Sequence, residues 1–105
     1  DLNGTITGGG PEKMTINIRD NISPIVPGPY NNISIPNMNI GCIVTYTQSV
    51  SVVWATSVTN LNSFVINMTS ITATRATGIF SGTLYLNVSG PATKTITNGS
   101  FSIGY

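Results

Sequence analysis

The chain has 105 residues, of which 40% are apolar and only 7% are charged, and its formal net charge is +1. This length fits one domain, and the apolar fraction is too high for a disordered segment. The four basic residues are dispersed over positions 13, 19, 75 and 94, and no apolar run approaches the roughly twenty residues of a membrane-spanning helix, so we expect neither nucleic-acid binding nor membrane insertion.

The first ten residues predict an extended segment followed by a hinge. The chain starts at Asp1 without the basic and apolar stretches of a signal peptide, which indicates a processed product. Residues 2–7 are extended, and three glycines at positions 8–10 precede Pro11. We therefore divide the chain into residues 1–10, a candidate donor strand with a glycine hinge, and residues 11–105, a single β-sandwich domain.

Alternation of apolar and polar residues, typical of β-strands, begins at residue 14 and continues to the C-terminus. In the first run Met14, Ile16 and Ile18 share one face, opposite Thr15, Asn17 and Arg19. The later apolar faces are Ile33 and Ile35; Ile40, Cys42, Val44 and Tyr46; Val50, Val52 and Trp54; Phe64, Ile66 and Met68; Phe80, Leu84, Leu86 and Val88; and Phe101, Ile103 and Tyr105. No window shows a helical repeat with caps, so we expect no helix.

Turn-forming residues separate these runs at short intervals. Residues 24–30, with three prolines and Gly28, predict a rigid connection, and residues 60–62 and 89–91 predict turns. Asn98-Gly99 predicts a type I′ hairpin, so that the last strand folds back on its neighbour. The chain is therefore predicted to be all-β, an antiparallel β-sandwich or a partly open β-barrel of about seven to nine short strands.

The single cysteine, Cys42, cannot form an internal disulfide. It belongs to an alternating apolar run, which predicts a buried side chain; a reactive or intermolecular thiol is the alternative.

Six N-x-S/T sequons make covalent glycans a candidate modification. They lie at Asn3, Asn21, Asn32, Asn67, Asn87 and Asn98. A chain so rich in Asn, Ser and Thr forms some sequons by chance, and Asn98 precedes Gly99, where a turn is the expected role.

The inventory of reactive side chains argues against an enzyme. The chain has no histidine, and its only carboxylate side chains are those of Asp1, Glu12 and Asp20. This removes the usual general base and metal ligand, and no pair of acids is placed to converge. We expect no catalytic residues, no metal site and no cofactor.

Aromatic side chains can stack on sugar rings when one ring face is exposed. Trp54 and Tyr46 share faces with apolar residues, which predicts core positions for both. Tyr30, beside the prolines, and Tyr105, at the end of the chain, are the better exposed candidates.

Two C-terminal stretches, residues 76–84 and 95–101, resemble the closing hairpin of a family of small secreted all-β proteins of unknown function that is common in Bacteroidetes. Residues 28–30 and 44–47 resemble earlier landmarks of that family. The resemblance implies an exported all-β domain and brings no catalytic residues. It also implies one further strand before Leu2, and the lack of that strand would leave a groove in the sheet.

Scarcity of charge favours association, because charged side chains normally keep strand edges from pairing with other chains. We predict a non-enzymatic structural subunit, extracellular or on the cell surface, that polymerises with copies of itself head to tail into a fimbria-like filament by β-strand complementation. The predicted subunit interface comprises Leu2, Ile6, Met14, Ile16, Ile18, Phe101, Ile103 and Tyr105. The alternatives are a monomeric secreted binding module for a small apolar ligand or a glycan, and an accessory domain of a longer surface protein.

Overall fold

The computed structural model describes residues 2–7, 12–34, 38–49, 51–60, 62–86 and 92–104. These residues form eight strands and no helix: β1 (Leu2–Thr7), β2 (Lys13–Asp20), β3 (Gly28–Asn31), β4 (Ile40–Ser49), β5 (Val52–Ala55), β6 (Phe64–Ile71), β7 (Arg75–Leu86) and β8 (Thr93–Gly104). All strand pairs are antiparallel. The predicted fold class is confirmed. Nowhere in these ranges is there a helix of the length and apolarity that a bilayer span requires.

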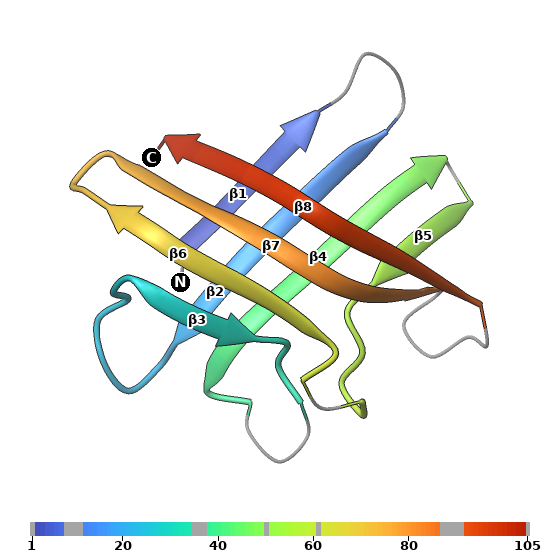
Figure 1. Cartoon of the computed structure of the whole chain (residues 1–105), viewed down its shortest axis with the longest axis horizontal. Coiled ribbons are helices and arrows are strands. Elements are labelled where there is room, and N and C mark those ends of the chain that lie inside the picture. Colours follow the sequence, from blue (N-terminus) through green and yellow to red (C-terminus); the bar gives the residue numbers. More distant parts are fainter. Residues whose placement is uncertain are drawn as a thin grey trace.

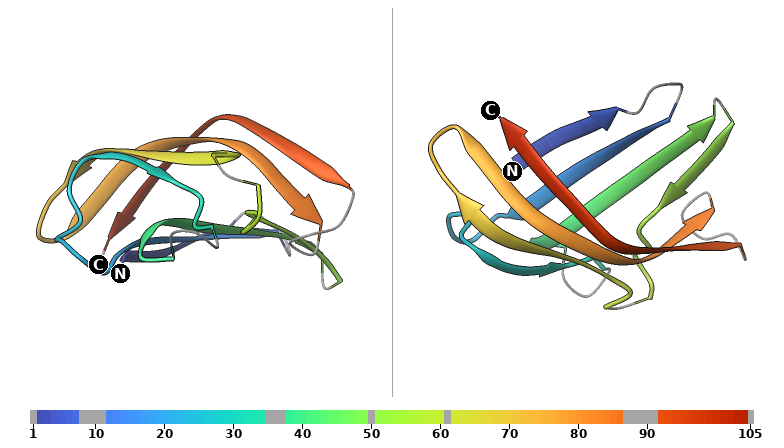
Figure 2. Two further views of the ribbon diagram at one scale, coloured as in Figure 1. Left: turned by 90° about the horizontal axis from the view of Figure 1, so that it is seen from below. Right: turned by 45° about the horizontal axis from the view of Figure 1, so that its top comes forward.

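The strands form two layers that cross each other (Figures 1 and 2). One layer contains β1, β2, β4 and β5, and the other contains β3, β6, β7 and β8. The long strand β7 joins them, because its first part pairs with β6 while Tyr85 and Leu86 pair with β5. The result is a single sheet in the order β1-β2-β4-β5-β7-β6-β3, with β8 on the other side of β7.

The core lies between the two layers and is built from the predicted apolar faces. Ile16 and Ile18 on β2, Cys42 and Val44 on β4, and Phe64, Ile66 and Met68 on β6 are all at most 1% exposed. Each buried aliphatic or aromatic side chain contributes roughly 1.5–3 kcal/mol to stability. The ring of Phe80 lies 6.2 Å from that of Phe64 and 6.3 Å from that of Phe101, so aromatic contacts continue the core across β6, β7 and β8.

The prediction of a hairpin turn at Asn98-Gly99 is wrong. Both residues lie inside β8, where Phe80 faces Gly99 and Gly82 faces Ile96, so that the register shifts by one residue. Asn98 adopts φ 55, the left-handed conformation that asparagine tolerates well. Thr97 and Asn98 therefore lie opposite Ser81 in a β-bulge, which bends the strand without ending it.

The connection between β7 and β8 falls after Leu86, whose N–H donates to the carbonyl oxygen of Ala92 at 3.0 Å. The turn predicted at residues 89–91 lies outside the described residues, as do the glycine hinge and the apolar positions Ile35, Val50 and Val88. The turn predicted near residue 62 is supported, because Asn62 has φ 56.

The proline-rich connection is shorter than predicted, since β3 begins at Gly28. Tyr30, expected to be exposed, is only 6% exposed. Its hydroxyl donates to the carbonyl oxygen of Val26 at 2.9 Å and accepts from the Val26 N–H at 3.0 Å. Both hydrogen bonds tie the ring to its own loop, so Tyr30 is a structural residue and no platform for a sugar.

Candidate functional site

The sheet is open between β1 and β8. Within the described ranges, each of these strands has a hydrogen-bonded neighbour on one side only. On the opposite side of the molecule, the chain after β3 is joined to β4 by a bridge between Asn32 and Cys42. Figure 2 shows β1 beside the end of β8. Two strand edges thus flank one opening, and each presents backbone N–H and C=O groups to a further strand.

A groove of about 600 Å³ lies at this opening. Asn3, Gly4 and Thr5 of β1 and residues 102–104 of β8 line it, together with side chains from β2 and β4. Asn17 of β2 donates a hydrogen bond to the side chain of Asn3 across the strand pair. Neither edge carries a charged residue at these positions, and the charged group beside them is the Arg75 guanidinium of β7, which donates to Ser102 Oγ at 2.8 Å.

Most of the predicted interface residues lie in the core of their own chain. Leu2, Ile16, Ile18, Phe101 and Ile103 are at most 8% exposed and pack in one cluster, and Met14 is half-buried against them. The side chain of Ile6 and all of Tyr105 lie outside the described part of the structure. The interface prediction for these five residues therefore stays a prediction, because within one chain they pack as core residues. They can meet another subunit only if β1 leaves its own sheet.

The predicted donor strand is the first strand of this sheet. All six residues of β1 pair with β2, from Leu2 opposite Ile18 to Thr7 opposite Lys13. Asn3 and Thr5 are exposed, and Leu2 closes one end of the core. A β1 strand exchanged between copies would remake these same contacts.

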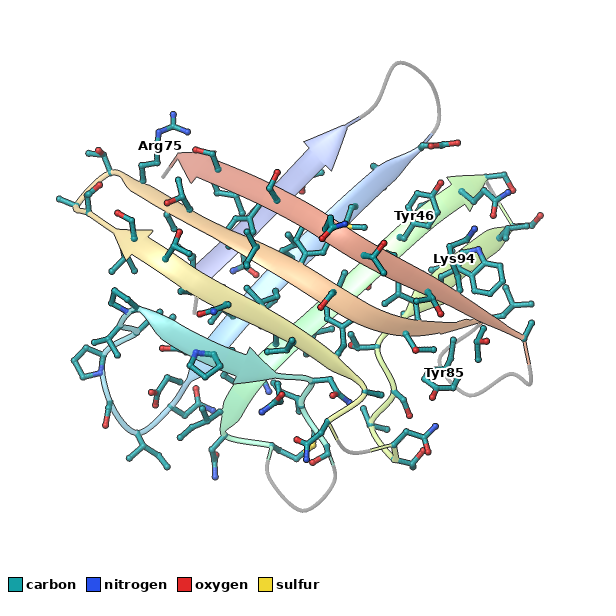
Figure 3. All side chains as sticks on the ribbon, in the orientation of Figure 1. Tyr46, Arg75, Tyr85 and Lys94 are labelled. Carbon is teal, nitrogen blue, oxygen red and sulfur yellow. The ribbon has the colours of Figure 1, made fainter. Side chains whose placement is uncertain are left out.

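A second cluster occupies the other end of the space between the layers; we call it the aromatic mouth and define it as Tyr46, Trp54 and Lys94. Tyr46 of β4 and Trp54 of β5 are in-register neighbours on the inward face of one layer. Lys94 of β8 reaches them from the other layer, with Nζ 5.2 Å from the Trp54 ring centroid and 5.9 Å from that of Tyr46. Figure 3 shows Lys94 and Tyr46 together at this end.

Trp54 and Tyr46 were predicted to be core residues, and the structure corrects this to half-buried. The Trp54 Nε1–H donates to Gln48 Oε1 at 3.1 Å, which fixes the indole ring. The pKa of the Tyr46 hydroxyl is raised, first by burial and then by Glu12, whose carboxylate accepts its hydrogen bond and disfavours the phenolate. Sequence reasoning missed this cluster, although Lys94 has the same alternation parity as Ile96 and so already pointed inward.

Cys42 is fully buried, as predicted. Burial raises the pKa of its thiol from 9.0 to about 12, outweighing a hydrogen bond with the backbone of Ile66 that lowers it. Since the thiolate is the nucleophile, the folded protein keeps this thiol unreactive at neutral pH.

The sequons differ in what the fold allows. Asn32 is 5% exposed, and its side chain holds four backbone groups: Nδ2 donates to the carbonyl oxygens of Ser57 and Asn60, and Oδ1 accepts from the N–H groups of Ser63 and Phe64. The folded domain has no room for a glycan there, so Asn32 is removed from the candidate sites. Asn3, Asn21, Asn67 and Asn98 are exposed, and Asn87 lies outside the described residues.

In the part of the chain that the structure describes, no three His, Cys, Asp or Glu side chains gather as a metal site requires. No family model, curated protein or solved structure matches this chain.

Proposed function

We propose that this protein is a non-enzymatic extracellular structural subunit that assembles with copies of itself by exchanging β1. The observation that carries the proposal is that β1 is an edge strand beside the opening to β8, where both strands line a groove with uncharged residues. An exchanged β1 would pair with β2 of the next copy, and the chain after it would continue into its own domain. If each copy receives β1 from one neighbour and donates its own to another, the contact is heterologous and propagates into a filament.

The position of β1 supports the exchange. It is an edge strand with β2 as its one pairing neighbour among the described residues, so it can be removed without breaking any other pair of strands. The sequence has three glycines at positions 8–10, and glycine is the residue type with the widest range of allowed backbone angles. In an exchanged assembly Leu2, Ile16 and Ile18 would become interface residues, as the sequence predicted.

Site-specific cross-linking tests the exchange directly. Asn3 of β1 and Asn17 of β2 are in register on the outward face. In a Cys42→Ala background, one preparation carries Asn3→Cys and the other Asn17→Cys; the two are mixed, unfolded, refolded and oxidised. Exchange predicts disulfide-linked dimers containing one chain of each kind, and negative-stain microscopy of the unmodified protein should show filaments.

A matched control uses Asn67→Cys and Ile79→Cys, an exposed in-register pair on β6 and β7, away from the exchanged strand. The double variant should cross-link within one chain, and the mixed single variants should not cross-link with each other. If Asn3→Cys reacts with residue 17 only when both substitutions are on the same chain, and the protein stays monomeric at high concentration, β1 does not exchange and the proposal fails.

A further inference from the structure

The aromatic mouth has features that packing alone does not require. Lys94 faces inward beside Leu84, its in-register neighbour on β7, which is fully buried. An aliphatic side chain at this position would close the end of the core without removing an ammonium group from part of its water. After Asp20 the chain carries only two charged residues, Arg75 and Lys94, and one of them is placed over the only tryptophan.

The two rings form a continuous platform. Met14, Tyr46, Trp54 and Leu86 are successive in-register neighbours across β2, β4, β5 and β7, so their side chains stand in one row. The polar edges of both rings are already engaged, by Gln48 on the indole and by Glu12 on the phenol. Lys94 lies over the rings of both residues, so a ligand that stacks on these rings must displace its ammonium group, which sits on a flexible stem.

We propose that the aromatic mouth binds the ring of an uncharged hexopyranose. The electron-rich faces of Trp and Tyr attract the polarised C–H groups on one side of a sugar ring, as they attract a cation. Lys94 then moves from the ring faces to donate to sugar hydroxyls, and the Glu12 carboxylate accepts from them. Charges of opposite sign on the two sides of the platform suit a neutral ligand with both donors and acceptors better than they suit an ion. This site is independent of the exchange of β1.

The fluorescence of Trp54 reports on the site directly, because the chain has no other tryptophan. The intact protein is titrated with cellohexaose, mannohexaose and lactose, and with polygalacturonate as the acidic counterpart. We expect at least one neutral probe to shift or quench the emission with saturation below about 10 mM, the range of weak single-site binding. The same titration in high salt should give the same affinity, since the ligand carries no charge.

Two variants test the named residues. Lys94→Met keeps the length of the side chain and removes its donors, and it should weaken binding about tenfold. Lys13→Met is the matched control, because Lys13 lies at the same end of the sheet, is exposed and faces outward; its affinity should equal that of the wild type. Glu12→Gln removes the charge of an exposed residue, so it leaves the core intact and serves if Lys94→Met does not fold; it too should weaken binding.

The proposal is overturned if no neutral probe changes the emission, or if only polygalacturonate does so and its effect disappears in salt. It is also overturned if Lys94→Met and Glu12→Gln both fold and bind the neutral probe as the wild type does. In those cases the cluster serves to hold β8 against β4 and β5.

Discussion

The side chain of Ile103 on β8 lies directly over Gly4 on β1. A Cβ atom at residue 4 would be 2.1 Å from Ile103 Cδ1 and under 3 Å from two further carbons of the same side chain. The absence of a side chain at Gly4 is therefore what lets the end of β8 approach β1 without pairing with it. This contact sets how closely β1 and β8 approach each other at the opening.

Replacing Gly4 by valine should push these strands apart. Since the whole Ile103 side chain must move, we expect Gly4→Val to lower the free energy of unfolding by about 1–3 kcal/mol. Urea denaturation measures the change. Thr5→Val, next along β1 and exposed, should change stability by less than about 0.5 kcal/mol. Equal effects of the two substitutions would show that the contact with Ile103 is unimportant.

Comparing Gly82 with Gly28 separates the cost of an unfavourable φ angle from the cost of steric clashes with a new side chain. Their φ angles are nearly identical, 143° and 141°. A Cβ at Gly82 would lie 2.5 Å from Phe64 Cα and from the Ser63 carbonyl oxygen, whereas a Cβ at Gly28 would meet nothing within 4 Å. Gly28→Ala should cost about 1–2 kcal/mol, from φ alone.

Gly82→Ala adds a backbone clash to the same φ cost, so it should destabilise the protein by at least about 2 kcal/mol more than Gly28→Ala. Thermal unfolding of both variants, followed by circular dichroism, gives the comparison. A similar loss for both variants would mean that β6 and β7 can separate at Gly82 without penalty.

The Asn32 side chain links β3 to the loop that leads into β6. Asn32→Ala would leave the backbone groups of Ser57, Asn60, Ser63 and Phe64 without its four hydrogen bonds, so we expect a loss of about 3 kcal/mol or more. Asn67→Ala, at an exposed sequon, should fall within about 0.5 kcal/mol of the wild type. Denaturant unfolding of the two variants side by side decides whether asparagine at residue 32 is structural.

Cys42 should make stability depend on alkaline pH. Its pKa is 9.0 in the unfolded chain and about 12 when folded, so the folded state favours the neutral thiol. The contribution is complete below pH 9 and is lost as the pH rises towards 12, at up to about 1.4 kcal/mol per pH unit. Unfolding of the wild type and of Cys42→Ala is compared under reducing conditions from pH 7 to about 10.5. Parallel curves for the two proteins would exclude a role of this thiol.

The strands and core were predictable because a strand exposes its residues to the two sides alternately. That pattern placed Ile16, Val44 and Ile66 on inward faces, and all three are buried. The hairpin predicted at Asn98-Gly99 was wrong, because that prediction used turn propensity alone. Pairing along the length of β7 keeps β8 continuous, so Asn98 lies in a bulge and Gly99 pairs with Phe80.

The candidate sites were less predictable than the fold. Lys94 meets Tyr46 and Trp54 only because β8 lies across the other layer, forty residues later in the chain than Trp54. Asn32 has the same sequon chemistry as Asn67, and only the bridge to Cys42 and the loop before β6 bury it. Tyr30 was predicted to be exposed because prolines surround it in the sequence. In the structure the preceding loop folds back, and the backbone of Val26 hydrogen-bonds to the Tyr30 hydroxyl.

By itself the sequence determined that this protein is an antiparallel β domain with an apolar interior, almost no charge and a buried thiol. These properties follow from local alternation and composition, which do not depend on how the strands are ordered. Only the tertiary structure decided that β1 and β8 flank the opening, that five of the predicted interface residues lie inside their own core, and that one lysine lies over two aromatic rings. The physical reason is that the order of the strands and the crossing of the layers bring distant residues together. Both are set by backbone pairing, and a sequence of alternating apolar and polar residues is compatible with several strand orders.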